Sequence, residues 1–380
     1  WKKFSKVMGN FKPDILGITG FSVKWPSAQR IAALGKDYDP NMPVIMGGQH
    51  ATIMTDSVLK NPHIDFVARG EGEETLIEFL REVEGEKNWK NVDGLSFKNE
   101  GIYHNQSREL LKDLDQLAFP ARECLYDLEN YSPQSLAKLF SSRGCPFKCT
   151  YCGTQNIWTY QLRHHSPQRI VEEVEHVKEQ YHETYFTFFD DVFAINKKQA
   201  MKLLDTMIES KVDINWDCLT RAHLVSDKLL SKMKQAGCKK IDIGVESGSD
   251  KILLDTQKGM TVKQLEKGAK LIQKHKIFLY CFLMVGLPTE NEEDVQMTKD
   301  FLIRVKPDWA GISIFTPIPG TKAYKDLEAQ GKIPKEPHFE KFSHQSPNSN
   351  FAFNMENREN FPKLAQDMIE FVQAYNGSWR

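Results

Sequence analysis

Short apolar runs alternate with amphipathic segments along the first 90 residues. Three runs have the length of buried strands, and each precedes a segment with the periodicity of a helix. The strands are predicted at 14–18, 44–46 and 65–68, and the helices at 27–36, 52–60 and 73–82. This alternation predicts a parallel sheet with helical crossovers. Because only three such units are visible, we expect the front of this Rossmann-like unit to be missing.

A second alternation begins near residue 138, after a predicted hairpin at 92–106 that turns at 99–101 and a proline-punctuated linker at 107–136. Its strands are predicted at 138–141, 184–189, 213–219, 240–245, 278–285 and 309–315. Six strand–helix units predict a partial (β/α)6 barrel rather than a complete eightfold one. A last helix at 358–375 is expected to pack outside the barrel.

Helix-capping signals support this pattern. Ser166 and Pro167 form a cap and first-turn pair, and Thr261 with Gln264 has the spacing of a capping box. The chain is therefore divided into a Rossmann-like unit at 1–90, a hairpin and linker at 91–136, a barrel at 137–330 and a C-terminal extension at 331–380. The predicted fold class is α/β.

The composition limits the classes of partner that are expected. The net charge of −1 and the apolar content of 40% give no reason to expect nucleic acid or an anionic membrane as a partner. No apolar run approaches the ~18 residues of a membrane span. The chain begins at Trp1 and shows no secretory pattern. Four scattered cysteines are interpreted as reduced core or surface thiols, which suits a reducing cytoplasm. They are Cys124, Cys218, Cys238 and Cys281.

The remaining cysteines, Cys145, Cys149 and Cys152, form a C-x3-C-x2-C run directly after the first barrel strand. Barrel enzymes place their chemistry at that end of the strands. Three thiolates leave one iron of a cube-shaped cluster open, whereas a structural zinc ion takes four protein ligands. Gly144 and Gly153 permit the close backbone approach that such a loop requires. A zinc knuckle remains the alternative, although no fourth cysteine or histidine follows at zinc-finger spacing.

The cysteine run resembles the signature of the radical SAM superfamily, and the resemblance covers residues 110–330. Further matching segments are Leu114–Arg122, Asp190–Phe193, Gly244–Ser249, Met284–Pro288 and Phe315–Thr321. Together they are similar to the branch with a cobalamin-binding domain before the barrel, which includes Mg-protoporphyrin monomethyl ester cyclases and cobalamin-dependent methylases. Three N-terminal segments match that domain: the one around Asp14, Gly47–Thr52 and Arg69–Glu73. The chain lacks the Asp-x-His-x-x-Gly run that would supply an axial histidine.

The resemblance implies a [4Fe–4S] cluster held by the three cysteines, S-adenosylmethionine (SAM) on the open iron, and cobalamin. It implies SAM cleavage to a 5′-deoxyadenosyl radical and methyl transfer to an unactivated carbon of a small-molecule or peptide natural-product-type substrate. The electron would come from a reductant such as flavodoxin or ferredoxin. Two alternatives stay open: a radical cyclisation, oxidation or rearrangement without methyl transfer, and a metal-stabilised binding module that is not an enzyme.

The barrel strand ends supply the predicted SAM ligands. Glu246 and Ser247 would bind ribose or an amino group, the alternative being a helix cap. Of Asp190 and Asp191, at least one is expected to line the site, since adjacent side chains of a strand point oppositely. Arg221 would pair with the SAM carboxylate, or else form a surface salt bridge. Backbone contacts to the cofactor are predicted from Gly153, Gly286 and Phe315, the alternative for Gly286 being that it serves only its turn.

For cobalamin, Gly47, Gly48 and Gly70 would let the corrinoid approach the backbone. Ligands of open parallel sheets bind at such strand ends. His50 follows the two glycines and is a weak candidate for an axial ligand. Phe21 and Trp25 would flank the ring or pack in the core.

Overall fold

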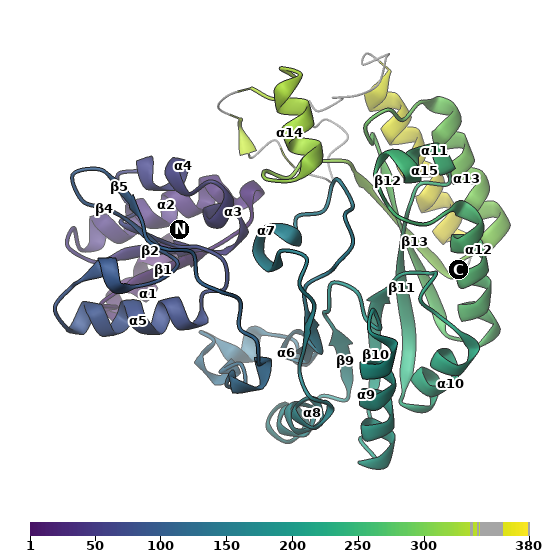
Figure 1. Ribbon diagram of the computed structural model, residues 1–380, viewed down its shortest axis with the longest axis horizontal. Helices are drawn as coiled ribbons and strands as arrows, with labels where there is room; N and C mark the ends of the chain where they lie inside the picture. Colours follow the sequence, from purple (N-terminus) through teal and green to yellow (C-terminus); the bar gives the residue numbers. More distant parts are fainter. Residues whose placement is uncertain (335–336, 340–341, 343–359, 379–380) are drawn as a thin grey trace.

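The computed structural model describes residues 1–334, 337–339, 342 and 360–378. Two sheets organise the chain, and helix α7 (Gln155–Trp158) lies between the two units that they form (Figure 1). Within the described residues, none of the helices has the length and apolar character that a membrane span needs.

The N-terminal sheet confirms the three predicted strands and extends further. Its strands, in spatial order, are β1 (Leu16–Thr19), β2 (Val44–Gly47), β3 (Phe66–Ala68), β4 (Leu95–Lys98) and β5 (Ile102–His104). Strands β1 to β3 are parallel, and β4 and β5 form the predicted hairpin. Strand β4 lies beyond the predicted boundary at residue 90 and pairs antiparallel with β3, so the hairpin continues the N-terminal sheet. Phe66 and Phe97 lie opposite each other in this pairing and share one apolar core.

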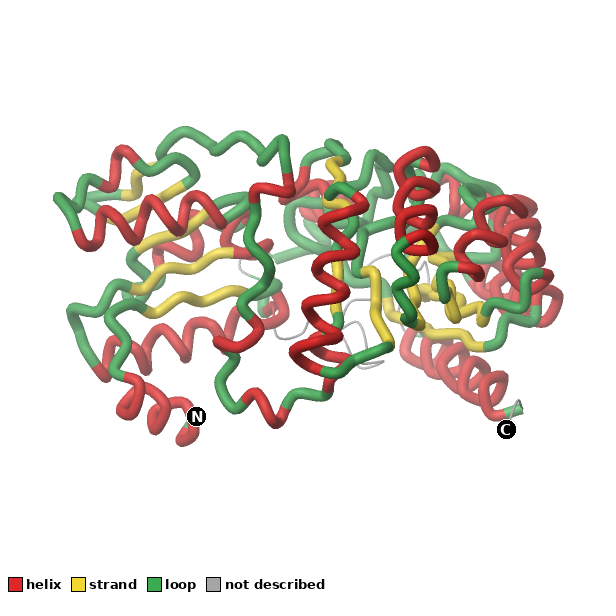
Figure 2. Tube along the Cα trace, turned by 90° about the horizontal axis from the view of Figure 1, so that it is seen from below, coloured by secondary structure: helices red, strands yellow, loops and turns green. Residues whose placement is uncertain are grey.

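Helices cover both faces of this sheet (Figure 2). They are α1 (Lys2–Phe11), α2 (Trp25–Tyr38), α3 (Gly48–Ile53), α4 (Thr55–Lys60) and α5 (Glu73–Glu84). The helix predicted at 52–60 is divided in two because Met54 leaves helical geometry, with φ −107° and ψ 33°. Helix α1 was not predicted. Met8 is its only buried residue, and Phe4 packs partly buried against the same apolar core.

The second sheet is the predicted partial barrel. Its six parallel strands, in spatial order, are β13 (Trp309–Ile314), β12 (Phe278–Val285), β11 (Cys238–Glu246), β10 (Asn215–Thr220), β9 (Tyr185–Phe188) and β6 (Lys138–Leu139). The main helices are α8 (Pro167–Tyr181), α9 (Lys197–Glu209), α10 (Asp227–Gln235), α12 (Val262–Lys274) and α13 (Glu292–Val305). Both predicted helix caps are formed: Ser166 accepts from the Arg169 amide, and Thr261 and Gln264 complete a capping box.

Alternation along the barrel strands separates the core from the concave face. In β11, Ile241, Ile243 and Val245 are fully buried against the outer helices, whereas Gly244 and Glu246 face the other way.

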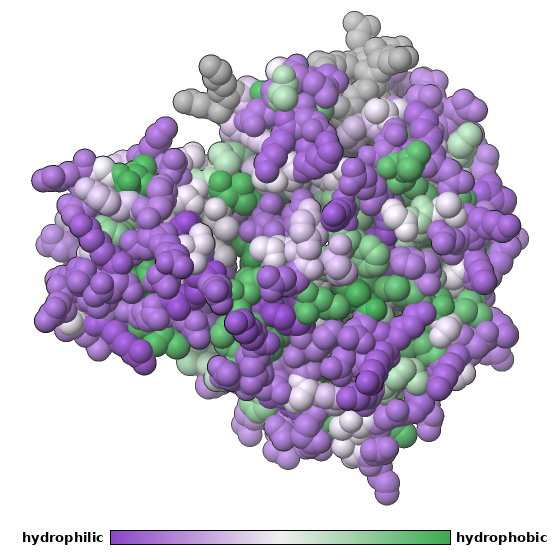
Figure 3. All heavy atoms as spheres, viewed as in Figure 1, coloured by the Kyte–Doolittle hydropathy of each residue, from purple (hydrophilic) through white to green (hydrophobic). Residues whose placement is uncertain are grey.

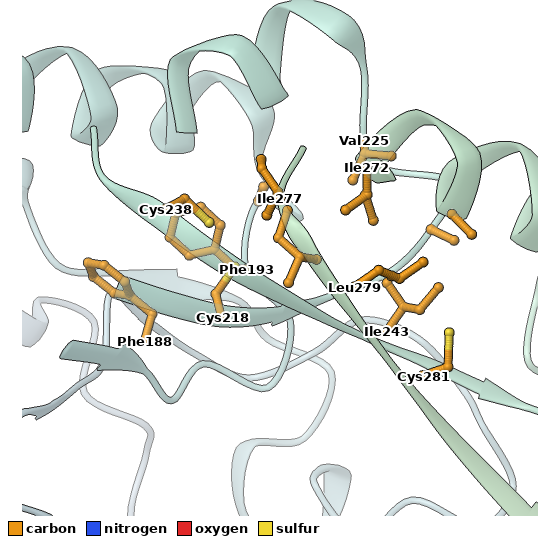
Figure 4. Close-up of a cluster of buried hydrophobic side chains, with 14 of the residues drawn as sticks. Phe188, Phe193, Cys218, Val225, Cys238, Ile243, Ile272, Ile277, Leu279 and Cys281 are labelled. Carbon is orange, nitrogen blue, oxygen red and sulfur yellow. The ribbon is translucent and has the colours of Figure 1, made fainter. Parts of the chain in front are cut away.

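Cys218, Cys238 and Cys281 lie among these apolar side chains (Figure 4), and Cys124 is exposed, as the sequence predicted. On the face seen in Figure 3, apolar side chains gather in a band between polar flanks.

Four shorter helices complete the described chain: α6 (Pro133–Leu136), α7, α11 (Asp250–Asp255) and α14 (Lys322–Ala329). The last helix, α15 (Phe361–Gly377), packs outside the barrel as predicted, and its Asn376 side chain bonds both backbone polar groups of Ala310 in β13. The first two residues of the predicted helix, 358 and 359, lie outside the described residues, as does most of the extension before them.

Glu290 closes the turn after β12 and sets a pH dependence. Its Oε2 accepts from the amides of Gly286 and Leu287 at 2.5 and 3.3 Å, and the side chain is 2% exposed. Burial raises the pKa of this carboxyl from 4.5 to about 8. The folded state therefore holds a proton that the unfolded chain releases, and stability should fall as the pH rises from 4.5 to 8.

Glu290→Gln mimics the protonated form and keeps an oxygen acceptor. We expect it to exceed the native protein in unfolding free energy at pH 8 by on the order of 2–4 kcal/mol, with no gain at pH 4.5. Urea unfolding at the two pH values measures this, with Glu292→Gln at an exposed neighbour as the control. An equal effect of Glu290→Gln at both pH values would contradict the assignment.

Candidate active site

The cysteine run crosses the barrel mouth as a glycine-bounded loop. It follows a short strand, β7 (Ser142–Arg143), which pairs antiparallel with β8 (Arg163–His164). Gly144 has φ +96°, and a Cβ there would overlap the Gln161 carbonyl oxygen, so only glycine fits. A Cβ on Gly153 would likewise overlap the Gln49 side chain, which reaches in from helix α3.

All three cysteines line one cavity of about 390 Å³ between this loop and the strand ends of the barrel. No fourth cysteine and no histidine stands among the described residues of its lining. Among the described residues no three Cys, His, Asp or Glu side chains converge as ligands of a single metal ion would. A cluster instead takes one thiolate at each of several iron atoms, so the donor set fits a cluster with three protein ligands.

The protein environment opposes ionisation of two of these thiols. Burial raises the pKa of Cys145 to about 11 and raises that of Cys152. The Arg221 guanidinium donates from Nη1 to the Cys149 sulfur at 3.5 Å. Metal ligation needs thiolates, and the iron of a bound cluster would supply the positive charge that holds the sulfurs deprotonated.

A buried ion pair lies beside the cysteines. The Lys258 ammonium is 2.7 Å from a carboxylate oxygen of Glu246 and 3.2 Å from the Tyr151 hydroxyl. Glu246 ends β11 with φ +65°, which turns its side chain back over the mouth. Lys258 is 5% exposed and was missed by the sequence analysis, since a lysine after a short helix carries no periodic signal. A Cβ on Gly244 would overlap the Glu246 carboxylate and lie 2.8 Å from the Lys258 ammonium, so a larger residue there would displace this ion pair.

Two further predicted ligands line the cavity. Arg221 is buried, stacks 3.8 Å from the centre of the Phe147 ring and donates to the Lys258 carbonyl, so it is not a surface salt bridge. Its Nε has no partner among the described residues. Asp191 accepts from the Thr154 hydroxyl at 2.8 Å and from the Gly144 amide at 3.2 Å, and burial raises the pKa of its carboxyl.

Three residues predicted as cofactor ligands lie outside the lining of this cavity. Asp190 is buried and accepts from the Ser141 hydroxyl at 2.8 Å, which braces the start of the cysteine loop. Ser247 is fully buried, bonds the Thr298 hydroxyl and accepts from the Ser249 amide. Gly286 has φ +86°, and a Cβ there would lie 2.8 Å from the Phe361 ring. A role of these residues in cofactor binding stays a prediction.

A second cavity, of about 410 Å³, lies between the two units. Phe21 and Gln49 come from the N-terminal unit, and Phe315 from the end of β13. Phe315 lines this second cavity and not the first, and its predicted contact with the cofactor stays a prediction. Tyr151, Met284 and Ser313 line both cavities. The two spaces thus share one wall.

The N-terminal strand ends are glycine-rich for different reasons. Gly48 has φ +86°, and a Cβ there would lie 2.6 Å from the Thr19 hydroxyl oxygen. Gly47 leaves room for ordinary contact with Ala68, and Gly70, at φ +74°, faces open space. All three stand where the sequence placed them, at the carboxyl ends of β2 and β3.

His50 does not line either cavity. It is fully buried, its Nδ1 bonds the Ser22 hydroxyl at 2.9 Å, and the Trp25 and Phe339 rings lie 5.0 Å away. Burial lowers the pKa of His50 to about 4. Trp25 packs in the core, whereas Phe21 is 66% exposed at the second cavity.

A buried carboxylate joins the N-terminal unit to the cysteine loop. Glu71 accepts from Arg143 at 2.9 Å and from Arg163 at 2.8 Å, and it also accepts from the Leu111 amide. Arg143 directly precedes Gly144 and makes a second ion pair with Glu73 at 2.7 Å. These contacts place the segment Arg69–Glu73 against the base of the cysteine loop. The sequence analysis identified this segment only by its resemblance to the cobalamin-binding domain.

Comparisons with known proteins agree with this architecture. The model of the radical SAM superfamily matches residues 139–302, and that of the B12 binding domain matches residues 2–80. An uncharacterized methyltransferase of Pyrococcus horikoshii is 31% identical over 84% of this chain and 71% of its own length. The anaerobic magnesium-protoporphyrin IX monomethyl ester cyclase of Rubrivivax gelatinosus is 26% identical over 88% of this chain, which spans only 62% of that relative.

Solved structures share the fold. The radical S-adenosylmethionine methyltransferase TsrM from Kitasatospora setae superposes with a TM-score of 0.76 at 15% identity, covering 87% of this chain and 67% of that one. The cobalamin-dependent S-adenosylmethionine radical enzyme OxsB, with aqua-cobalamin bound, gives 0.75 at 16% identity, covering 99% of this chain and 64% of that one.

Replacing Glu71 tests whether its ion pairs hold the cysteine loop against the N-terminal unit. Glu71→Gln leaves the buried Arg163 without its carboxylate partner and the half-buried Arg143 with only Glu73, so we expect a loss of unfolding free energy on the order of 2–4 kcal/mol. Glu78→Gln is the matched control, because Glu78 pairs with Arg108 away from the cysteine loop. Thermal unfolding and iron content after anaerobic reconstitution measure the effect. If both variants unfold at the same temperature and bind the same amount of iron, the ion pairs of Glu71 do not hold the loop.

Proposed function

The chain belongs to the radical SAM superfamily, in the branch with a cobalamin-binding domain before the barrel, and from this we propose that it transfers a methyl group to an unactivated carbon of a small-molecule or peptide substrate. Its cofactors are a [4Fe–4S] cluster, SAM and cobalamin. When bound, the cluster and SAM supply a 5′-deoxyadenosyl radical, and cobalamin carries the methyl group.

One observation carries the proposal: a charged cavity beside the cysteines and an apolar cavity beside the B12-binding domain share the wall formed by Tyr151, Met284 and Ser313. A substrate carbon near this wall would lie between a radical source on one side and a methyl carrier on the other.

The charged side chains of the first cavity are suited to the polar groups of SAM. Lys258 and Arg221 would bind its carboxylate, and Arg221 has an unused Nε for this purpose. Glu246 would accept from ribose hydroxyls or the ammonium group. In the Glu246–Lys258 ion pair, each buried charge compensates the other while no ligand is bound.

The second cavity is suited to a corrinoid face. Its lining is mostly apolar, with Phe21, Phe315 and Pro317 among its residues. Gly47, Gly48 and Gly70 would let the ring approach backbone at the carboxyl ends of β2 and β3. Because His50 is buried and bonded to Ser22, we propose that cobalamin binds here without an axial histidine.

The setting of the reaction also belongs to the proposal. All seven cysteines are free, which suits a reducing cytoplasm. A one-electron reductant such as flavodoxin or ferredoxin would supply the electron that SAM cleavage needs.

A second function is favoured by the likeness to the Rubrivivax cyclase over 88% of this chain. In that case the radical would lead to cyclisation, oxidation or rearrangement, with no methyl transfer. The residues bound to SAM would be unchanged, and the two functions differ in what happens at the second cavity.

Isotope-labelled SAM separates the two functions. The anaerobic, reduced protein with bound cobalamin is incubated with S-adenosyl-[methyl-²H₃]methionine. We expect it to form S-adenosylhomocysteine and trideuteromethyl-cobalamin, and mass spectrometry detects both products. A product pattern of 5′-deoxyadenosine without S-adenosylhomocysteine would support the cyclase-type reaction and reject methyl transfer.

The SAM-binding role of Lys258 is tested by Lys258→Met. Loss of one buried charged contact should weaken SAM binding by about 10- to 100-fold while iron content stays native. Equilibrium dialysis with labelled SAM gives the dissociation constant. Lys251→Met is the control, since Lys251 pairs with Asp294 outside the cavity. Native affinity in Lys258→Met would remove this residue from the SAM site.

A further inference from the structure

A third cavity, of about 290 Å³, lies beside the base of the cysteine loop, between β6, the start of α8 and residues 117–136 of the predicted linker. Its wall includes Arg143, whose guanidinium is paired with carboxylates of the N-terminal unit. Arg143 directly precedes Gly144, and the Gly144 amide donates to Asp191 in the lining of the first cavity. The third cavity and the first therefore flank the same turn of the chain.

Positive charge exceeds negative charge around the third cavity. Glu173 is the only carboxylate among its described lining residues, and two lining arginines share it, Arg122 at 2.8 Å and Arg169 at 3.2 Å. Lys138 also lines the cavity, and its ammonium donates to the neutral Thr187 hydroxyl at 3.0 Å. Three positive charges thus stand against one negative charge, which favours an anion in this space.

Arg122 has an unused donor at this cavity. The residue is 7% exposed, its Nε donates to the Leu136 carbonyl at 2.6 Å, and its Nη2 donates to the Lys138 carbonyl and to Glu173. Its Nη1 is buried and has no hydrogen-bond partner among the described residues. A buried donor without an acceptor is costly, and an oxyanion in the cavity would supply that acceptor.

Exposed aromatic side chains adjoin the cavity. Phe140 lines it and is 46% exposed, and its ring meets the Phe189 ring edge-on at 6.1 Å. Phe189 is 59% exposed, and the Lys138 ammonium lies 5.9 Å from the centre of its ring. Two residues further along the chain, Asp191 lines the first cavity. The aromatic pair thus joins the wall of the third cavity to a strand end at the first.

We propose that the third cavity binds an anionic group, a carboxylate or a phosphate, of the substrate that receives the methyl group. Phe140 and Phe189 contact an apolar part of the same molecule. The inference rests on the proposed function and adds the chemical class of the substrate. The cavity has the volume of the smallest ligand pockets, about 300 Å³, which suits one end of a substrate. Binding at a group remote from the reacting carbon would position that carbon near the first cavity.

The test titrates small anions into the full chain after anaerobic reconstitution, with isothermal titration calorimetry as the readout. The probes are benzoate and phenyl phosphate, which carry the two anionic groups on an aromatic ring, and benzyl alcohol, which is neutral. Arg169→Gln removes one excess charge and leaves Glu173 paired with Arg122. Arg304→Gln is the matched control, because Arg304 pairs with Glu266 on the outer helices.

We expect the native protein to bind one anion per chain, and the tighter of the two probes identifies the anionic group. Arg169→Gln and Lys138→Met should each weaken that binding about 10-fold, because each loses one charged contact. Lys138→Met gives a second variant at a side chain that is not part of a buried ion pair. Arg304→Gln and Lys258→Met should keep the native affinity, and benzyl alcohol should bind at least about 10-fold more weakly than the anion.

Three results would overturn the proposed site: no binding of either anion by the native protein, equal affinity for benzyl alcohol, or native affinity in both Arg169→Gln and Lys138→Met. A loss in Lys258→Met alone would place the anion in the first cavity and would also overturn it. These titrations need no turnover. Failure of the proposed function would appear separately, as absence of S-adenosylhomocysteine from labelled SAM.

Discussion

The buried carboxylate of Glu71 is the contact on which the position of the cysteine loop depends. It joins two arginines from β7 and β8, the short strands that bracket the loop, to the N-terminal unit. Separating a buried ion pair leaves uncompensated charge, which costs several kcal/mol. The two units therefore form one assembly around the loop, and the cavities on its two sides are consequences of that contact.

The two cavities differ in the chemistry that they can hold. The one next to the cysteines contains charges of both signs, and each charged side chain already has a bonding partner within the protein. The one between the units is lined mostly by apolar side chains. Tyr151 belongs to both linings because it lies between two of the cysteines. The spacing of the cysteine run thus also fixes a wall between two binding spaces.

Much of the fold could be predicted from the sequence because parallel strands and their helices have strong, local patterns. Scattered positions predicted that Cys218, Cys238 and Cys281 are core or surface thiols, and the structure buries all three in the barrel core. The union of the hairpin with the first sheet could not be predicted, since it depends on the tertiary pairing of β4 with β3. Lys258 was missed for a similar reason: its neighbours Glu246 and Tyr151 are distant in sequence. For Asp190 and Asp191, alternation predicted opposite directions but could not say which one faces the cavity.

The central claim is that the loop supplies three thiolates and leaves one iron for SAM. Electron paramagnetic resonance of the reduced, anaerobically reconstituted protein, recorded with and without SAM bearing ¹⁷O in its carboxylate, tests this most directly. The account predicts a reduced-cluster signal whose g-values shift on SAM addition and whose lines show hyperfine coupling to the label. A protein without iron, or a cluster signal that SAM leaves unchanged, would contradict it.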